Sequence, residues 1–183
     1  MNITFFGAFS ILVLWSRQRL GFGPLGHGLL LSCSAVGGVI GSVLAARLER
    51  RLGASTLLRV GLLIETATHL TLALTRTPWV GCLAIGVFGV HAVVWGTVTM
   101  ALRQRVVPGQ LRGRVNSVYY FFGVGGFALG ALQGGFVAQA FGITAPFWLA
   151  FSVMVVFTAC AWRLFSRSAL DYERHQVVQE VRA

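Results

Sequence analysis

The sequence contains no lysine and only five acidic residues, so arginine carries all of the chain's fixed positive charge. Charged residues make up 11 % of the 183-residue chain, whereas a soluble globular domain carries roughly 25 %. This shortage of charge excludes an ordinary soluble globule. Because hydrophobic residues reach 56 %, the composition predicts a chain that is surrounded by lipid.

Motifs of enzymes and metal sites are also missing. The sequence has no G-x-S-x-G, no H-E-x-x-H, no Walker A motif and no carboxylate pair of the catalytic kind, and three of its five acidic residues lie in the C-terminal tail. Its three cysteines, Cys33, Cys82 and Cys160, lie far apart and each sits in an apolar run, which gives no support to a disulfide framework or a zinc site. We therefore expect neither an enzyme nor a bound metal or other cofactor.

The net charge of +10 could indicate nucleic-acid binding. The positions of the arginines argue against it, because they lie at the ends of apolar runs and not along one face of a folded domain. We expect membrane lipid to be a partner and nucleic acid not to be one.

Apolar segments of the sequence predict six transmembrane helices, since a helix needs about 20 mostly apolar residues to cross a bilayer. In order, they cover residues 2–16, 27–46, 56–75, 79–102, 115–138 and 146–162. A glycine and a proline within residues 139–146 separate the last two. The predicted fold is an all-α membrane protein, with a six-helix transmembrane bundle over residues 1–165 and a cytoplasmic tail over residues 166–183.

The arginines are divided very unequally between the two sides that six spans define. One side holds only Arg17, Arg19 and Arg76, and the other holds the remaining twelve arginines. Because positively charged loops stay in the cytoplasm during insertion, we expect both termini to be cytoplasmic in a bacterial inner membrane. The cytoplasmic arginines are Arg47, Arg50, Arg51, Arg59, Arg103, Arg105, Arg112, Arg114, Arg163, Arg167, Arg174 and Arg182.

Three stretches of the sequence resemble the major facilitator superfamily of transporters. Residues 42–51, SVLAARLERR, look like a degenerate copy of the loop signature G-x-x-x-D-R-x-G-R-R, in which Arg47, Arg50 and Arg51 match. Residues 107–117, VPGQLRGRVNS, and the glycine-rich residues 122–135 are similar to the tenth loop and eleventh helix of macrolide and siderophore exporters. The signature's aspartate is Ala46 here, so the locking role of that aspartate does not carry over.

The resemblance implies that these helices form the C-terminal half of an efflux-type transporter, built as two inverted three-helix repeats. It implies alternating access, with proton-coupled export of a small amphipathic molecule whose identity is unknown. A twelve-span transporter needs about twice this length, so we expect a fragment, a truncated gene product or a half-size protein. Such a half could work as a homodimer or with a separate N-terminal half. The alternative is a non-transporting membrane subunit or a truncated remnant.

Regularly spaced glycines predict contact faces between helices, because small residues let membrane helices approach closely. Gly37 and Gly41 form one G-x-x-x-G pattern, and Gly126, Gly130 and Gly134 form a second at the same spacing. The alternative is the general tolerance of membrane helices for glycine.

Ionisable side chains at membrane depth are candidates for function. Glu65 and His69 lie four residues apart on one face of the third predicted helix, which favours a proton-coupling pair or, alternatively, a structural hydrogen-bonded pair. The resemblance makes this helix peripheral and so favours the structural alternative.

The fourth predicted helix carries His91 near its middle, as a further proton-coupling candidate. Phe88, His91, Trp95 and Thr99 share one face by their spacing, and an aromatic face of this kind suits a cationic or amphipathic molecule. The alternative is an aromatic packing seam. Gln133 is a further candidate for the substrate pathway. Arg112 and Arg114 are expected to set the topology, or alternatively to contact lipid phosphates or gate the inner face.

Overall fold

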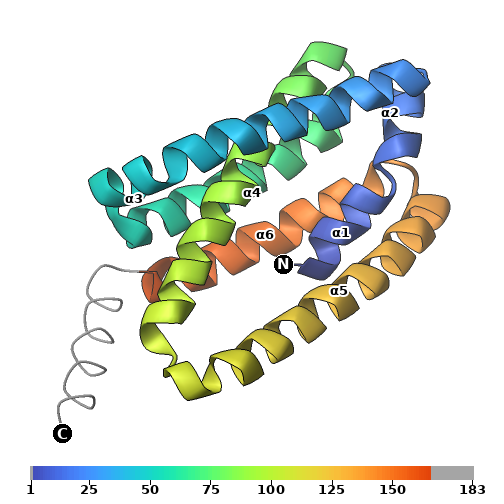
Figure 1. The fold of residues 1–183 in the computed structure, drawn as a ribbon. Helices are drawn as coiled ribbons and strands as arrows, with labels where there is room; N and C mark the ends of the chain where they lie inside the picture. The colour runs from blue at the N-terminus through green and yellow to red at the C-terminus, as the bar shows by residue number, and fades with distance from the viewer. Residues whose placement is uncertain (1, 166–183) are drawn as a thin grey trace, which may run out of the picture.

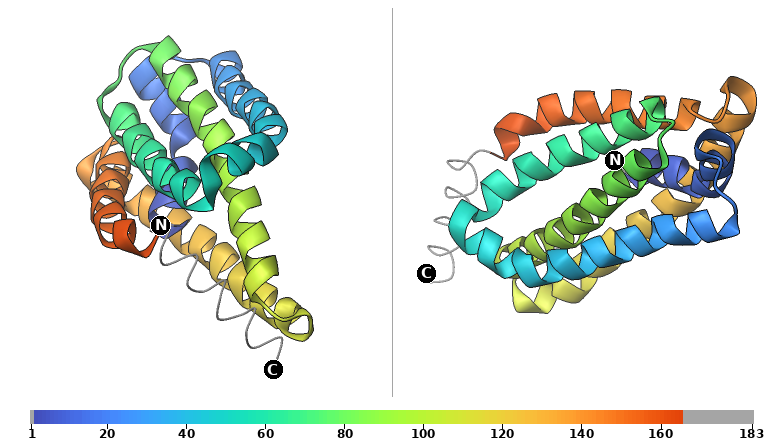
Figure 2. Two further views of the ribbon diagram at one scale, coloured as in Figure 1. Left: turned by 90° about the vertical axis from the view of Figure 1, so that its left-hand side faces the viewer. Right: turned by 90° about the horizontal axis from the view of Figure 1, so that it is seen from above.

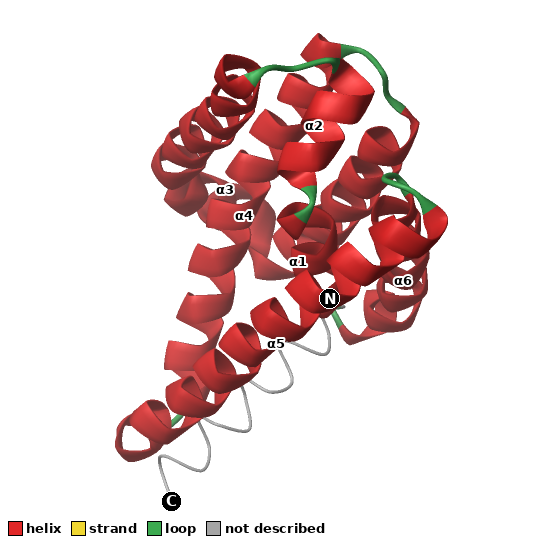
Figure 3. Ribbon diagram, turned by 90° about the vertical axis from the view of Figure 1, so that its right-hand side faces the viewer, coloured by secondary structure: helices red, strands yellow, loops and turns green. Residues whose placement is uncertain are grey.

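The computed structural model describes residues 2–165, and within this range the chain consists of helices joined by short turns, without strands (Figures 1 and 3). The predicted tail over residues 166–183 lies outside the described residues. The elements are α1 (Asn2–Ser10), α2 (Leu12–Leu20), α3 (Pro24–Leu74), α4 (Pro78–Val106), the 3₁₀ turn η1 (Gly109–Leu111), α5 (Arg112–Phe141) and α6 (Ala145–Leu164).

Four helical segments are long and apolar enough to cross a membrane. They are α3, α4, the combined η1–α5 segment over residues 109–141, and α6. The first predicted span differs from these, because its helix is interrupted at Ile11. Helix then continues to Leu20, which gives α1 and α2 of nine residues each. Neither of these two helices alone reaches the length that a bilayer requires.

Helix α3 is 51 residues long, and one residue inside it is not helical. At Gly53 the backbone has φ 77° and ψ 157°, and the chain turns back there (Figures 1 and 2). We call residues 24–52 the first arm and residues 54–74 the second arm. The predicted non-helical loop between residues 46 and 56 is therefore wrong, because the helix continues on both sides of a single glycine.

Gly53 occupies a backbone region that is almost restricted to glycine, because a Cβ atom there collides with the neighbouring peptide groups. We expect Gly53→Ala to lower the stability of the bundle by about 1–3 kcal/mol. The matched control is Gly28→Ala, since Gly28 lies within the same helix and has no neighbouring atom within 4 Å of the place that an alanine methyl group would take. Thermal unfolding in detergent, followed by tryptophan fluorescence, should show a lower Tm for the first variant only. Equal Tm values for both would contradict the assignment.

Arg19 fixes the end of α2 to the end of the second arm. Its guanidinium donates hydrogen bonds to the carbonyl oxygens of Thr75 (3.2 Å) and Leu74 (3.3 Å). These carbonyls belong to the last turn of α3, where no further helical N–H is present to donate to them. A cation is also favoured there by the helix dipole. One of the three arginines assigned to the non-cytoplasmic side thus has a structural role.

The largest buried cluster lies between α2, α3, α4 and α6. Its centre contains Trp15, Leu30, Ile85 and Phe147, each nearly inaccessible to solvent. By contrast, many large apolar side chains point outward, including Leu25 and most of the aromatic residues of α5. Burying such residues normally drives folding in water. An outer surface of this kind is instead typical of helices that contact lipid.

Glycines mark the two closest contacts between helices. Along the first arm and α4, a Cβ atom at Gly37 would overlap the backbone of Gly86, and one at Gly41 would lie 2.7 Å from the carbonyl oxygen of Val90. Along α1 and α5, a Cβ at Gly134 would overlap the backbone of Gly7. In both places the helices approach backbone to backbone, which small residues allow.

Candidate functional site

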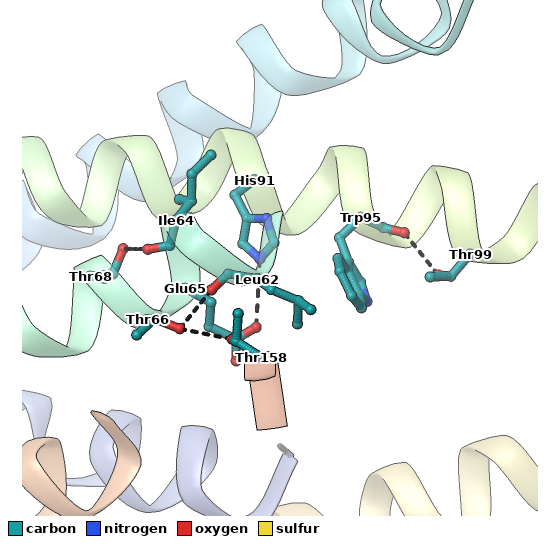
Figure 4. Close-up of polar contacts among 9 residues, drawn as sticks. All are labelled: Leu62, Ile64, Glu65, Thr66, Thr68, His91, Trp95, Thr99 and Thr158. Carbon is teal, nitrogen blue, oxygen red and sulfur yellow. Dashed lines mark hydrogen bonds and ion pairs between the residues drawn. The ribbon is translucent and has the colours of Figure 1, made fainter. Parts of the chain in front are cut away.

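The second arm and α4 bring two ionisable side chains together inside the bundle. His91 Nε2 lies 3.7 Å from Glu65 Oε2, and the two side chains are only 5 % and 3 % exposed. Figure 4 shows them pointing toward one another from neighbouring helices. Burial of a charge without a partner costs several kcal/mol, so each side chain depends on the other for compensation.

Glycine at position 61 allows this approach, and the sequence patterns did not single it out. A Cβ atom there would lie 2.9 Å from His91 Cε1 and 2.9 Å from Trp95 Cε3. Gly61 is four residues before Glu65, on the same face of the second arm. The G-x-x-x-E spacing of Gly61 and Glu65 could have predicted this contact. A glycine one helical turn before a buried carboxylate leaves room for an aromatic or histidine ring of a neighbouring helix beside that carboxylate.

Helix α6 adds a hydroxyl contact beside the ion pair. The hydroxyl groups of Thr66 and Thr158 lie 3.2 Å apart, and the Thr66 hydroxyl also donates to the carbonyl oxygen of Leu62 at 2.7 Å (Figure 4). Thr158 was not among the predicted site residues. The second arm therefore has polar contacts with two helices, through Glu65 to α4 and through Thr66 to α6.

His69 is buried, with 3 % of its surface exposed, but it does not share the ion pair. Among the described residues neither of its ring nitrogens has a hydrogen-bond partner. Its ring packs edge-on to Phe5 of α1 with centroids 6.2 Å apart. A cavity of about 10 Å³ adjoins His69, which is roughly the space that one water molecule needs. The structure adds a contact of Glu65 with His91 on another helix, and the predicted proton-coupling role of Glu65 with His69 stays a prediction.

The four residues predicted to share a face of α4 lie along one line of contacts. The ring of His91 is 5.7 Å from that of Phe88 and 5.7 Å from that of Trp95, and the Thr99 hydroxyl donates to the Trp95 carbonyl oxygen at 2.8 Å. Phe5 stacks on Phe88 at 4.9 Å. This line packs against the second arm and α1. His91 is thus enclosed by the bundle, not presented on an open face.

Gln133 lies in a different part of the bundle, at the contact of α5 with α1. A Cβ atom at Gly7 would lie 2.6 Å from Gln133 Oε1, and this oxygen is buried without a hydrogen-bond partner among the described residues. Gly126, Gly130 and Gly134 are buried on the same helix. The glycine pattern of α5 and Gln133 therefore face α1.

The predicted loop arginines fall on helices, and most are exposed. Arg47, Arg50 and Arg51 lie near the end of the first arm, and Arg114 lies in the first turn of α5. Arg112, the first residue of α5, donates from Nε to the carbonyl oxygen of Val107 (3.1 Å) and from Nη2 to that of Gln104 (2.9 Å). It therefore caps the end of α4, a role the sequence patterns did not indicate.

A comparison with protein families gives a match that covers nearly the whole chain. The family model described as transmembrane secretion effector matches residues 3–180. No curated protein matches the chain. Among the described residues no group of three histidine, cysteine or acidic side chains could hold a metal ion.

Proposed function

This chain belongs to the transmembrane secretion effector family of the major facilitator superfamily, and from that premise we propose that it exports a small amphipathic molecule by alternating access. Proteins of this superfamily are membrane transporters and generally not enzymes. The proposed driving force is proton entry. The observation that carries the proposal is the Glu65–His91 ion pair, buried between two helices in an otherwise apolar bundle.

An ion pair in this position can couple a proton to a change of shape. When Glu65 is ionised and His91 is protonated, Coulomb attraction holds the second arm against α4, and the low dielectric of the bundle strengthens it. Binding of a proton to the Glu65 carboxylate removes that attraction. Protonation of Glu65 therefore changes the free-energy difference between two packings of the same helices. A switch requires a local charge change of this kind that favours one of two packings. His69, four residues away, is a second proton acceptor in reach of the same helix face.

We propose six spans arranged as two inverted three-helix repeats. In this scheme α1 with α2, the first arm and the second arm form one repeat, and α4, α5 and α6 form the other. Three contacts support it: Gly7 with Gly134, Gly37 with Gly86, and Thr66 with Thr158. A two-fold axis that exchanges the repeats would map the first contact onto the second and the third onto itself, as inverted repeats require.

The proposed orientation places both termini in the cytoplasm of a bacterial inner membrane. The ends of the first arm and of α4 lie together, since Arg105 Nη2 contacts Glu49 Oε1 at 3.1 Å. This end carries most of the described arginines, and the positive-inside rule then assigns it to the cytoplasm.

The substrate class that we propose is an amphipathic cation with an aromatic group. The rings of Phe88 and Trp95 each lie 5.7 Å from the His91 ring, and Phe5 stacks on Phe88. Aromatic rings bind cations through their quadrupoles. A second half is proposed to complete the pathway, either another copy of this chain or an N-terminal six-span half. Support comes from the exposed Phe136 and Phe141 near the end of α5, which could pack on protein as well as on lipid.

The test uses inside-out vesicles from the native membrane, with ethidium and related amphipathic cations as probes. Wild-type vesicles should show probe-dependent release of protons from the acidified lumen, detected by a pH-sensitive dye. Glu65→Gln should reduce this signal to the level of vesicles lacking the chain, because a glutamine cannot bind the coupling proton. The control is Glu49→Gln, which changes the other described carboxylate and should retain the signal.

Persistence of the proton signal in Glu65→Gln would eliminate this residue as the coupling site. If no probe moves protons in wild-type vesicles, the alternative of a non-transporting subunit or truncated remnant is favoured. Native mass spectrometry of the purified particle distinguishes the cases further. Two copies of the 19.7 kDa chain, or one copy with a second six-span chain, supports a complete pathway, and a lone monomer supports the alternative.

A further inference from the structure

A basic pocket lies where α4 ends and α5 begins, outside the site described above. Its polar lining consists of Arg103 and Gln104 from α4 and of Arg112 and Asn116 from α5. No carboxylate contributes to this lining. Its free volume is about 10 Å³, too small to enclose a phosphate, so an anion would lie at its open mouth, against guanidinium and amide groups from two helices.

Packing holds both guanidinium groups of this pocket in place. The Arg103 guanidinium lies 3.8 Å from the centre of the Tyr119 ring, and its Nε is buried without a hydrogen-bond partner among the described residues. Arg112 is fixed by its bonds to the carbonyl oxygens of Val107 and Gln104. These bonds use two of the five N–H donors of a guanidinium. Preorganised donors of this kind are suited to the oxygens of a phosphate.

The charges around the pocket are not balanced within the described residues. At this end of the bundle the described residues include one carboxylate, Glu49, and it is paired with Arg105. Arg112 and Arg114 occupy the first turn of α5, which contains no acidic residue and no side-chain cap. Positive side chains are unfavourable there, because the helix dipole already places positive charge at that end. An anion from outside the described chain would remove this unfavourable arrangement.

The neighbouring aromatic residues indicate the depth of the pocket in the membrane. Tyr119, Tyr120, Phe121 and Phe122 follow the arginines by two turns and are strongly exposed. Tyrosine prefers the level of the lipid headgroups, and the apolar phenylalanine rings that follow it favour the acyl region beyond that level. The arginines one to two turns before them then lie at the level of the lipid phosphates. We propose that this pocket binds the phosphodiester group of an anionic phospholipid, a role that does not depend on the transport proposed above.

The test measures lipid binding to the purified full-length chain by native mass spectrometry, with phosphatidylglycerol and phosphatidylcholine as probes. Wild type should bind phosphatidylglycerol in preference. The double variant Arg103→Gln/Arg112→Gln, which removes both guanidinium groups of the pocket, should weaken this binding roughly 30-fold, from the usual contribution of two basic residues near anionic lipid. The control is Arg17→Gln/Arg76→Gln, which removes the same charge from exposed positions at the other end of the bundle and should change binding less than about threefold.

Because Arg103 also packs on Tyr119 and Arg112 also caps α4, each single variant, Arg103→Gln and Arg112→Gln, is measured as well, and each should show a smaller loss of the same kind. Equal binding of the two lipids, or an equal loss in the control variant, overturns the proposal. Displacement of phosphatidylglycerol by millimolar inorganic phosphate would assign the pocket to a soluble phosphate and overturn the lipid assignment.

Discussion

Replacement of Gly134 by leucine is expected to prevent assembly of the bundle, whereas the same replacement at Gly135 is expected to leave it intact. At Gly134 a Cβ atom would overlap the carbonyl oxygen and the Cα atom of Gly7, which are backbone atoms that no rotamer change can move. Helices α1 and α5 would have to separate, and the neighbouring contact of Gly130 with Ile3 would be lost with them. Overpacking of a close contact costs about 1–3 kcal/mol even where side chains can adjust, and here they cannot.

Gly135 provides the control because it is exposed and has nothing within 4 Å of its Cβ position. Both variants add the same apolar volume to the same helix. The comparison uses the yield of monodisperse protein on size-exclusion chromatography and the Tm in detergent. If Gly134→Leu elutes and unfolds like wild type, the α1–α5 contact described above is wrong.

The second large effect concerns the ion pair, where one substitution should be more harmful than two. His91→Leu leaves the Glu65 carboxylate buried without a partner, and removal of one member of a buried pair costs about 3–5 kcal/mol. The double variant Glu65→Met/His91→Leu removes both charges and fills similar volume, so it should recover most of that loss. Unfolding in increasing SDS or urea, monitored by circular dichroism, gives the free energies for the complete double-mutant cycle.

Glu49→Gln serves as a reference in the same cycle, because the Glu49–Arg105 pair is largely exposed on its arginine side and surface pairs contribute about 0–1 kcal/mol. Two outcomes would argue that the Glu65 and His91 side chains do not interact. In the first, His91→Leu lowers the free energy of unfolding by no more than Glu49→Gln does. In the second, the double variant is as unstable as His91→Leu. Stability and proton coupling are separable here, since the double variant should fold and yet lack the proposed proton-dependent transport.

Apolar runs in the sequence were sufficient to predict membrane-spanning helix within α3, α4, α5 and α6, because composition alone identifies segments of bilayer length. Helices α4, α5 and α6 each extend beyond their predicted ranges by a few residues, since polar residues at the ends still form helix. The turn at Gly53 could not be located within its predicted loop. Residues 47–52 are mostly charged and mostly exposed, but arginine, leucine and glutamate are good helix formers. Within α3 the backbone is non-helical at Gly53 alone. The superfamily membership inferred from the loop motifs is confirmed by the family match over residues 3–180.

The ion pair was harder to predict than its members. Spacing along one helix shows that Glu65 and His69 share a face, but it carries no information about which face of another helix lies opposite. That depends on Gly61, which leaves space for His91 and Trp95, and on the glycine contacts that set the rotation of α4. The predicted efflux type, coupling ion and substrate pathway stay predictions until the measurements above are made.

The glycine contacts between α4 and the first arm restrict how the molecule can move. Close backbone approach at Gly37, Gly41 and Gly89 prevents α4 from rolling about its own axis, because any roll would drive a side chain into the facing peptide. Helix α4, which carries His91, and the first arm are therefore expected to move together as one rigid unit. The first arm joins the second arm, which carries Glu65, through the single backbone unit of Gly53. If the proposed transport cycle separates the two charges, Gly53 is the backbone unit about which the two arms would reorient, and a residue that cannot adopt its backbone angles would hinder that movement as well as destabilise the fold.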